Sequence, residues 1–300
     1  MAEGDADESP TILRRQLGRL LREAREGRGL SIASAAKAVQ LSFNALQRLE
    51  TGRTMKPRKQ DVRELCSVYE VSQEKTAQAV DLARRVAEAK DEDGITSLGK
   101  VISDSFYIYV DLERYAKHIV SYQEIVPGLL QTSDYARTLF GSFWDKQEDI
   151  DQRLRIRLDR QVIVTRRTSP IEFEALIHES ALHQVVGGPR IMAQQLRHLA
   201  DMSTHDNITV RIYPFSAGAP WGLAGKTFVK LDFGTNSKGD PVEPPIVFLD
   251  AAMSNDVYVE NPDQVRRYDK YADAIRSKAL NGLSMRDKLR DMAREYDRER

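Results

Sequence analysis

Two histidines, a glutamate and a serine lie close together in the second half of the chain, at His178, Glu179, Ser180 and His183. Serine, histidine and carboxylate side chains are the groups from which hydrolases build a nucleophile and its base. We nevertheless expect no hydrolase here. A serine two residues from a histidine points away from it on an extended or helical backbone, and the chain has no Gly-x-Ser-x-Gly turn to expose a serine nucleophile.

Metal and phosphate sites are not indicated either. His178 and His183 are five residues apart, which is a poor spacing for one helical face, and no His-Glu-x-x-His sequence occurs. Gly187-Gly188-Pro189 is not followed by the Gly-Lys-Ser/Thr sequence of a phosphate-binding loop. Glu179 is expected to start a helix or to form a salt bridge. The sequence therefore predicts no catalytic residue, no bound metal and no cofactor.

Polar residues near the N-terminus precede two short predicted helices. Ser31 and Ser42 each stand before a helical pattern, where a serine hydroxyl accepts a hydrogen bond from the first turn. The second helix is predicted over residues 43–50, and Gly52 supplies the left-handed residue that ends it. The turn between the helices falls near residues 39–41, and small alanines let the two helices cross closely. These features are typical of a helix-turn-helix.

Residues 30–53 resemble the Cro/repressor type of helix-turn-helix, in the broad family named for the xenobiotic response element. Gln40 departs from the pattern, because Gly usually occupies this place in the turn. At positive φ a residue with a side chain adds strain of about 1 kcal/mol. Arg25 and Glu50 match positions at which this repressor type pairs a basic with an acidic residue, tying the first helix to the third. An ordinary helical hairpin is the alternative interpretation of this stretch.

The resemblance implies which side chains contact DNA. By residue-to-residue match with the repressor pattern, Phe43, Asn44 and Arg48 face base edges. An Asn amide can form two hydrogen bonds with adenine, an Arg guanidinium can form two with guanine, and Phe43 would contact a thymine methyl group. Phosphates are expected at the helix starts and just past the second helix, beside Ser31, Lys37, Ser42, Arg53 and Lys56.

The distribution of charge favours this interpretation. The whole chain has 45 basic and 45 acidic residues, so its net charge excludes nothing. Residues 11–59, however, contain twelve Lys or Arg against three Glu, whereas residues 60–300 contain 33 basic against 38 acidic residues. A basic module on an acidic body is the electrostatic footprint of a nucleic-acid-binding protein. For any single one of these side chains, including Arg14 and Arg15, a solvated helix face is the ordinary explanation.

The chain length and the patterns predict two domains. Five helices are expected within residues 11–90, which form an all-α DNA-binding domain, and the charged, Gly-containing stretch 91–94 is the expected linker. Cys66 is the only cysteine and is expected in the core of this domain. The absence of disulfides makes the cytoplasm the expected location. The acidic first ten residues do not resemble a targeting peptide, and no apolar run is long enough to cross a membrane.

Residues 105–300 are predicted to form an α+β domain with a small mixed sheet and C-terminal helices. Strands are predicted at residues 171–177, 208–213, 226–233, 246–249 and 256–260, and helices at 112–122, 147–166, 190–203, 262–280 and 284–299. Residues 106–110 are left open between strand and helix. Ser284 and Asp287 are predicted to form a capping box. One face of the last helix is expected to dock on the domain through Met285, Leu289, Met292 and Tyr296.

This second region has a resemblance of its own. Val126-Pro127-Gly128-Leu129-Leu130-Gln131-Thr132, followed by Tyr135-Ala136, resembles the signature of a ligand- or partner-responsive domain of unknown chemistry. That domain follows repressor-type helix-turn-helix modules in actinobacterial regulators, some of them described as antitoxin-like. Further motifs fit the same family in order and spacing: Arg160-Gln161, Glu179–Leu182 with Val186–Gly188, and Gln194–Leu196. The resemblance implies a transcriptional regulator, often encoded beside a small partner protein, and not an enzyme.

Two functions are therefore expected. In the first, the protein is a repressor-like regulator that binds double-stranded DNA as a homodimer, and its second domain mediates dimerisation and responds to a ligand or a small partner protein. In the second, it is an antitoxin-like protein that neutralises a partner and autoregulates its operon. Candidate binding surfaces are residues 127–135 and the loop 214–222 with Phe215 and Trp221. The ordinary explanation for Trp221 is that it fills the core of its own domain.

Overall fold

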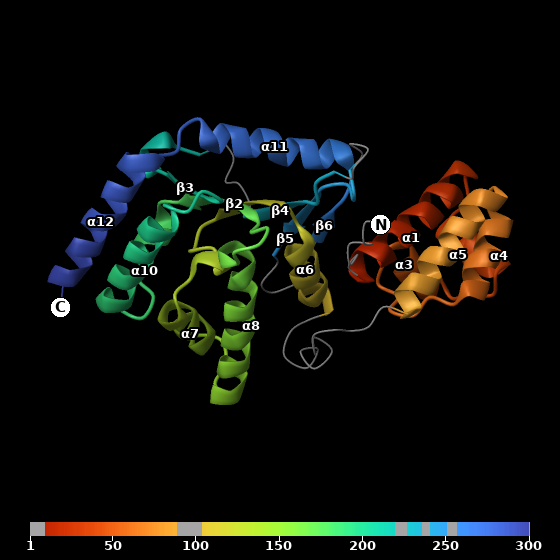
Figure 1. Cartoon of the computed structure of the whole chain (residues 1–300), viewed down its shortest axis with the longest axis horizontal. Coiled ribbons are helices and arrows are strands. Elements are labelled where there is room, and N and C mark those ends of the chain that lie inside the picture. The colour runs from red at the N-terminus through yellow and green to blue at the C-terminus, as the bar shows by residue number, and fades with distance from the viewer. Residues whose placement is uncertain (1–9, 89–103, 220–226, 236–240, 251–256, 300) are drawn as a thin grey trace. The chain divides into compact units, whose positions relative to one another are not determined.

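The computed structural model describes residues 10–88, 104–219, 227–235, 241–250 and 257–299. Contacts divide the chain into two units, residues 1–97 and 98–300. The first unit is helical, and the second contains a six-stranded sheet (Figure 1). The acidic start of the chain, the predicted linker 91–94 and Trp221 lie outside the described residues.

Within residues 10–88 the N-terminal unit consists of five helices around one core. They are α1 (Pro10–Gly27), α2 (Ile32–Ala38), α3 (Phe43–Glu50), α4 (Lys59–Val68) and α5 (Gln73–Glu88). Leucines from three of these helices, Leu17, Leu21, Leu46 and Leu65, are at most 1% exposed. Cys66 lies in the same core, as predicted. The all-helical class of this unit is confirmed.

Helix α1 crosses α3 at very short range because residue 18 is a glycine. A Cβ atom at Gly18 would lie 2.6 Å from the backbone oxygen of Glu50 and 2.7 Å from that of Leu49. No side chain fits at those distances. Ala35 and Ala36 on α2 are buried, as the close crossing of α2 and α3 requires. Small alanines at this crossing were predicted from the sequence, but the role of Gly18 was not.

The C-terminal unit is built on a mixed sheet with the strand order β3-β2-β1-β4-β5-β6. The strands β1, β2 and β3 run parallel, and the other neighbouring pairs are antiparallel. In the register of the central strands, Ile119 of β1 stands between Phe173 of β2 and Leu231 of β4. The bounds are β1 (His118–Gln123), β2 (Glu172–His178), β3 (Ile208–Tyr213), β4 (Phe228–Asp232), β5 (Ile246–Leu249) and β6 (Val257–Val259). The predicted α+β class with a mixed sheet is confirmed.

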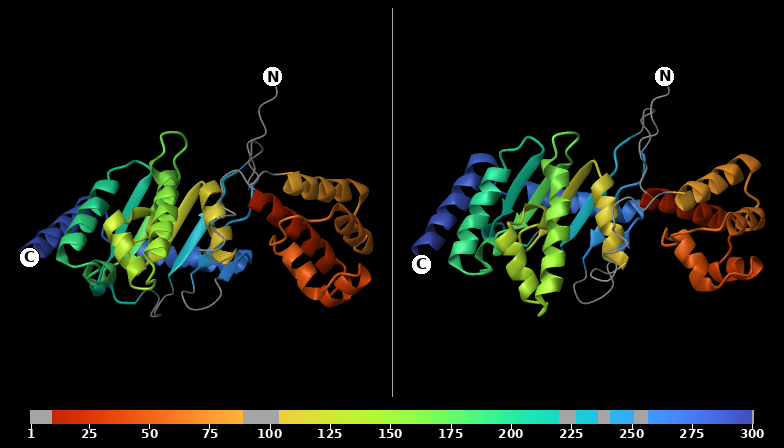
Figure 2. Two further views of the ribbon diagram at one scale, coloured as in Figure 1. Left: turned by 90° about the horizontal axis from the view of Figure 1, so that it is seen from below. Right: turned by 60° about the horizontal axis from the view of Figure 1, so that its bottom comes forward.

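Helices cover both faces of this sheet. Figures 1 and 2 show α11 along one face and α6, α8 and α10 on the other. Tyr122, Phe228 and Tyr271 belong to the core under α11. The helical elements are α6 (Asp104–Tyr115), η2 (Gly128–Leu130), α7 (Ser133–Gly141), α8 (Gln147–Thr165), α9 (Ser180–His183), α10 (Pro189–Met202), η3 (Phe215–Ala217), α11 (Pro262–Arg276) and α12 (Gly282–Arg298).

The predicted helix over residues 112–122 is wrong in its second half. Helix α6 ends at Tyr115, and His118 begins β1, which lies between β2 and β4 in the sheet. Four successive residues of β1, from Ile119 to Tyr122, are buried. A strand buried on both faces has no apolar–polar alternation, so its periodicity does not distinguish it from a buried helix. Residues 106–110, left open between strand and helix, belong to α6.

Helix α12 begins earlier than predicted. Its first residue is Gly282 and Asn281 precedes it, so Ser284 lies inside the first turn and its Oγ donates to the Asn281 carbonyl at 2.9 Å. The predicted capping box of Ser284 and Asp287 is therefore wrong. The apolar stripe of the helix is buried, as predicted, and packs against α10. Tyr296 extends the contact, since its Oη donates to the Leu182 carbonyl at 2.9 Å.

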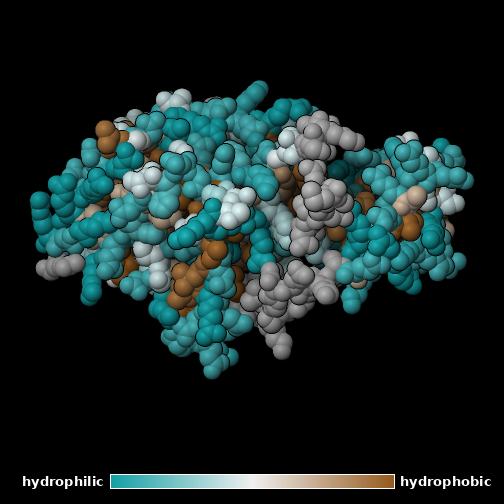
Figure 3. Space-filling view, viewed as in Figure 1, coloured by the Kyte–Doolittle hydropathy of each residue, from teal (hydrophilic) through white to brown (hydrophobic). Residues whose placement is uncertain are grey.

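Helix α8 also carries apolar side chains that face solvent. Leu158 is 38% exposed and Val162, one turn later, is 55% exposed. Ile125, just before η2, is 40% exposed. Figure 3 shows hydrophobic surface in the region of α7 and α8. These residues differ from the buried apolar face that anchors α8 to the rest of the unit, for example through Ile163 and Val164.

Candidate nucleic-acid interface

Serine side chains cap both helices of the helix-turn-helix, as predicted. Ser31 Oγ accepts a hydrogen bond from the Ser34 N–H, and Ser42 Oγ accepts one from the Ala45 N–H, each at 3.1 Å. The hydroxyl protons of Ser31 and Ser42 differ in whether they have an acceptor. The Ser34 Oγ donates to the Ser31 carbonyl at 2.9 Å and lies 2.9 Å from Ser31 Oγ, so the Ser31 proton is given to Ser34. The Ser42 proton has no acceptor among the described residues.

Both helices end in the same way, with a left-handed residue. Gln40 has a φ of 56°, and the Leu41 N–H donates back to the Ala36 carbonyl at 2.9 Å. Gly52 has a φ of 70°, and the Arg53 N–H donates back to the Arg48 carbonyl at 2.8 Å. This is the hydrogen-bond pattern of the Schellman motif. The predicted turn is confirmed, and Gln40 adopts the strained conformation that the sequence analysis considered.

The three residues predicted to face base edges lie on the exposed side of α3. Phe43 is 49% exposed, and Asn44 and Arg48 are exposed as well. Leu46 and Leu49, on the other side of the helix, are buried in the core. Asn44 and Arg48 are four residues apart, so they are neighbours on the helix surface. Contact of these residues with DNA stays a prediction.

The side chains predicted to contact phosphates are also on the surface. Ser31, Lys37, Ser42, Arg53 and Lys56 are all exposed. Within the described part of the chain, no ion pair neutralises Lys37, Arg53 or Lys56, nor Arg48 on α3. Their charges are therefore available to a partner molecule.

Two other arginines of the N-terminal unit are not solvated. Arg14 is 4% exposed and Arg15 is 8% exposed. The Nη1 of Arg14 lies 2.8 Å from the sulfur of Met55, and the Cγ of Arg15 lies close under Gly52. The explanation of a solvated helix face is thus wrong for these two residues, which take part in packing.

Every exposed charged side chain between residues 32 and 59 is basic. The set consists of Lys37, Arg48, Arg53, Lys56, Arg58 and Lys59. The one acid in that range, Glu50, is 3% exposed and accepts hydrogen bonds from Arg25 Nε at 2.7 Å and Nη2 at 2.9 Å. The predicted pairing is confirmed, and the hydrogen bonds that Arg25 donates to Glu50 raise the pKa of Arg25. Because Glu50 is buried, all the exposed charges between residues 32 and 59 are positive.

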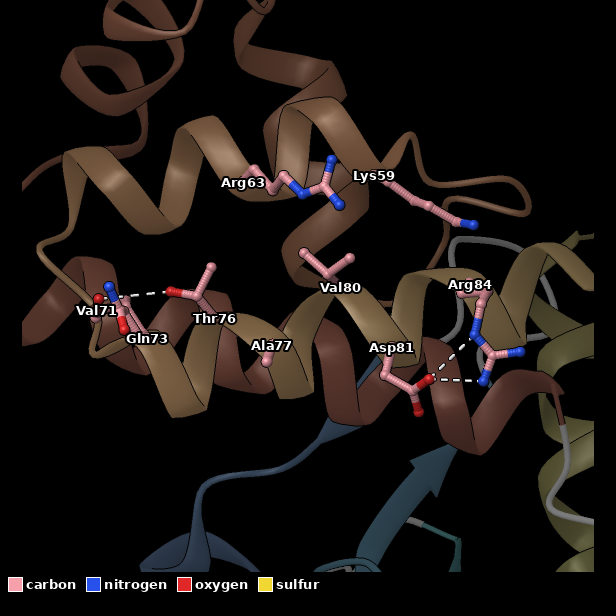
Figure 4. Close-up of a pocket in the computed structure, with 9 residues that line it drawn as sticks. All are labelled: Lys59, Arg63, Val71, Gln73, Thr76, Ala77, Val80, Asp81 and Arg84. Carbon is pink, nitrogen blue, oxygen red and sulfur yellow. Dashed lines mark hydrogen bonds and ion pairs between the residues drawn. The ribbon is translucent and has the colours of Figure 1, made fainter.

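A groove of about 590 Å³ lies between α4 and α5 (Figure 4). Apolar atoms of Val71, Ala77 and Val80 line it together with basic side chains. Lys59 and Arg63 come from α4, and Arg84 comes from α5, where Asp81 accepts its hydrogen bonds at 2.6 and 3.1 Å. This groove was not predicted from the sequence. Its signal was the spacing of Lys59 and Arg63, which places both on one side of a helix.

Known protein families match the chain in two places. A family model described as a helix-turn-helix domain matches residues 16–79, which include α2 and α3. A second model, described as a domain of unknown function (DUF5753), matches residues 107–291. The chain belongs to the DUF5753 family. No curated protein matches this DUF5753 chain, and neither does any solved structure.

Together the two matches make this member of the DUF5753 family a DNA-binding regulator of the helix-turn-helix type. The predicted order, with a helix-turn-helix before a domain of unknown function, is confirmed. The repressor type of the helix-turn-helix and the actinobacterial grouping stay predictions. Among the described helices, none combines the length and apolar character that a bilayer span needs.

In the DUF5753 region, glutamine side chains hold the segment 126–132. Gln161 on α8 donates to the carbonyls of Gly128 at 2.9 Å and Gln131 at 2.7 Å. Gln195 on α10 donates to the Leu130 carbonyl and accepts from the Thr132 N–H, both at 2.7 Å. Gln131 itself donates to the Val126 carbonyl at 2.8 Å. We call Gln131, Gln161 and Gln195 the glutamine clamp. Thr132 caps α7, since its side-chain oxygen accepts a hydrogen bond from the Tyr135 N–H at 3.4 Å.

The side chains of His178 and Ser180 meet, so the prediction that they point apart is wrong. His178 Nδ1 lies 2.7 Å from Ser180 Oγ and accepts the Ser180 N–H at 3.2 Å. The cause is the change from β2 to α9 at Glu179, whose φ of −56° and ψ of −26° turn the backbone. The imidazole thereby caps the start of α9.

Glu179 forms the salt bridge that was one of its two predicted roles. Its Oε1 lies 2.5 Å from Lys288 Nζ, and its Oε2 accepts the Phe215 N–H at 2.6 Å. Burial raises the pKa of Glu179, but the bonds from Lys288 and Phe215 outweigh burial, and the pKa is lowered overall. Phe215 itself is 55% exposed.

Proposed function

We propose that this protein recognises a specific operator through α3 and controls transcription from it. The observation that carries the proposal is the all-basic exposed surface of residues 32–59, with Asn44 and Arg48 side by side within it. Contacts between basic side chains and phosphates supply most of the affinity for DNA of any sequence. Asn and Arg can in addition read adenine and guanine in the major groove.

In this proposal each predicted residue has one role. Phe43, Asn44 and Arg48 contact base edges. The phosphate contacts come from Ser31, Lys37, Ser42, Arg53 and Lys56. Ser42 is a stronger donor to phosphate than Ser31, because Ser31 gives its hydroxyl proton to Ser34.

The proposed work of residues 105–300 is dimerisation together with sensing. A homodimer in the cytoplasm would bind a two-fold operator, and a ligand or a small partner protein would change the spacing of the two DNA-binding units. The N-terminal unit has a core of its own, which suggests that the larger C-terminal unit is not needed merely to support it.

One observation favours the alternative, an antitoxin-like protein that neutralises a partner and represses its own operon. Leu158 and Val162 are exposed one turn apart on α8, with Ile125 also exposed. An exposed apolar stripe of this kind is what a partner protein would cover. Co-purification of a small protein encoded beside this chain would support the alternative.

The decisive test of operator binding starts with the DNA fragments that the full-length protein selects from a genome. Binding to a selected fragment and to a scrambled one is then measured for wild type, Asn44→Ala and Arg48→Ala. We expect each variant to lose about 1–3 kcal/mol of discrimination while it keeps most of its binding to scrambled DNA. Gln78→Ala, an exposed side chain on α5, is the control. Wild-type discrimination in both α3 variants would refute base reading by α3.

The role of the C-terminal unit needs a second measurement. The fragment 1–92 and the full chain are compared for oligomeric state and for operator affinity. We expect the fragment to be monomeric and to bind the operator more weakly, because two linked half-site contacts are lost. A fragment that is equally dimeric, binds equally tightly and regulates normally in cells would contradict the proposed role.

A further inference from the structure

The C-terminal unit has a partly open cavity of about 110 Å³ on the face of the sheet opposite α11. Its apolar wall includes Ile119 of β1, Phe173 of β2 and Phe248 of β5. Tyr109 of α6 also lines the cavity, and its ring stacks on Phe248 with the centroids 4.2 Å apart. Gly128 and Gln131, from the segment held by the glutamine clamp, line the cavity beside α8.

Two arginines of α8 line this cavity, and of the two only Arg160 forms an ion pair within the described residues. Arg160 donates to Glu113 from Nε at 2.7 Å and from Nη2 at 2.9 Å, and Tyr109 Oη donates to the same carboxylate at 2.5 Å. Arg157 makes no ion pair within the described residues. Its Nη1 donates to the Gln131 side-chain oxygen, and its guanidinium lies 5.0 Å from the centre of the Phe140 ring.

The environment of Arg157 is unfavourable for a charge without a counter-ion. Its Nε is buried and has no hydrogen-bond partner among the described residues. Burial and the neighbouring Arg160 lower the pKa of Arg157 to about 10, against smaller opposing effects of Glu113, Tyr109 and Asp250. The side chain is therefore still charged at neutral pH. Asp250, which also lines the cavity, is exposed to solvent. A charge that is partly removed from water is stabilised by an opposite charge and by filled hydrogen bonds.

Gly128 is what allows the Arg157 guanidinium to lie where it does. A Cβ atom at Gly128 would be 2.8 Å from Arg157 Nη1. The glutamine clamp fixes the backbone of Gly128 from α8 through Gln161. The segment 126–132, whose sequence resembles a family signature, therefore forms one wall of the cavity, beside Arg157.

We propose that this cavity binds a small aliphatic carboxylate, whose carboxylate group pairs with Arg157 and whose hydrocarbon chain lies against the apolar wall. A planar guanidinium matches a carboxylate in shape and can donate two hydrogen bonds to it. The cavity is smaller than one that holds benzene, roughly 150 Å³, but it is partly open to solvent. The chain of an acid of about four or five carbons can therefore lie inside it while the rest of the molecule reaches the opening. The inference deepens the ligand-responsive part of the proposed function and rests on it only for any effect on DNA binding.

Binding is tested on the full-length protein without DNA, so its failure is distinct from a failure of operator recognition. Calorimetric titrations use butyrate, 2-methylpropanoate and 3-methylbutanoate, with butyramide as a neutral molecule of the same shape. We expect at least one acid to bind, and butyramide to bind about tenfold more weakly or worse, because it lacks the charge that pairs with Arg157.

The variant Arg157→Gln is expected to lower affinity for the acid by about tenfold or more. Arg153→Gln is the matched control. Arg153 lies one turn earlier on α8, and its Cζ lies 3.8 Å from the centre of the Trp144 ring. Its Nε is also buried and has no hydrogen-bond partner among the described residues. Unlike Arg157, however, Arg153 does not line the cavity. The control should bind the acid as wild type does.

A third variant keeps the test decisive if Arg157→Gln fails to fold. Ser121 is 3% exposed, lies on β1 and lines the cavity, so Ser121→Leu should fill the space and abolish binding without altering Arg157. The proposal is overturned if folded wild-type protein binds none of the three acids up to about 50 mM. It is equally overturned if butyramide binds as well as butyrate, or if folded Arg157→Gln or Ser121→Leu binds like wild type.

Discussion

Arg25 on α1 and Glu50 on α3 form a two-point ion pair, with Nε and Oε1 2.7 Å apart and Nη2 and Oε2 2.9 Å apart. Their side chains are 8% and 2% exposed. Arg25 Nη1 donates in addition to the Leu30 carbonyl at 2.8 Å. One guanidinium therefore joins the end of α1, the connection to α2 and the end of α3.

The first prediction is that Glu50→Ala destabilises the N-terminal unit by about 3–5 kcal/mol, because the buried guanidinium of Arg25 loses its counter-ion. Hydrogen exchange of peptides from residues 10–88 measures the free energy of opening of this unit. A double-mutant cycle with Arg25→Ala should give clear coupling. The exposed pair Arg58–Asp61 is the control, with coupling below about 1 kcal/mol. Independent effects at positions 25 and 50 would count against the pair.

The second prediction separates phosphate contacts from base contacts. Lys37→Ala and Arg53→Ala should weaken binding to selected and scrambled DNA alike, and each should reduce the slope of log affinity against log salt by about one unit. The measurement is a binding titration at several salt concentrations. Lys75→Ala on α5, also exposed, should keep the wild-type slope. If both test variants keep it too, Lys37 and Arg53 are only solvated charges.

The third prediction concerns the turn of the helix-turn-helix. Gln40→Gly should stabilise the N-terminal unit by up to about 0.5 kcal/mol. Relief of about 1 kcal/mol of strain at a φ of 56° exceeds the extra entropy of glycine in the unfolded chain, which costs about 0.5–1 kcal/mol. Hydrogen exchange of residues 10–88 again gives the free energy. Gln40→Ala keeps the strain and removes only the longer side chain, so it should change little. Stabilisation by alanine equal to that by glycine would show that strain is not the cause.

The fourth prediction concerns acid stability of the C-terminal unit. Burial raises the pKa of Glu174, but bonds from Arg276 and Arg211 outweigh burial and bring the pKa below its ordinary value of 4.5. A carboxyl group with a lowered pKa stabilises the folded state above its unfolded pKa, and that contribution is lost as pH falls through the folded pKa. Wild-type protein should therefore lose stability in the acid range below about pH 4.5.

Glu174→Gln should cost about 1–3 kcal/mol at neutral pH and make stability less dependent on pH in that acid range. Urea unfolding followed by tryptophan fluorescence reports on this unit alone, since both tryptophans, Trp144 and Trp221, belong to it. Glu172→Gln, an exposed carboxylate on the same strand, is the control. Equal pH dependence in wild type and Glu174→Gln would exclude this role of Glu174.

The features that the sequence predicted best depend on residues close together in the chain. Ser31, Ser42 and Thr132 bond to N–H groups three residues later, so a cap can be recognised from a few letters. The exposed positions of Asn44 and Arg48 follow from the same local register of α3. A resemblance to known repressors then suffices to assign them roles.

The features that the sequence did not predict depend on distant neighbours. β1 is a strand because β2 and β4 lie on either side of it, although its own residues have no strand periodicity. Arg14 and Arg15 look like part of a basic helix face but are buried. Arg157 resembles Arg153 in the sequence of α8, and only the fold shows that one of them lines a cavity.

The glutamine clamp also has a consequence for the order in which the protein folds. The bonds of Gln161 and Gln195 join the segment 126–132 to side chains 30 to 65 residues later in the chain. Closing such long loops lowers the entropy of the chain before the stabilising contacts form. The segment can take its shape only once α8 and α10 have been synthesised and packed, so the cavity wall is completed late. The five N-terminal helices make their core from residues 13–86 and can finish folding while the C-terminal unit is still leaving the ribosome.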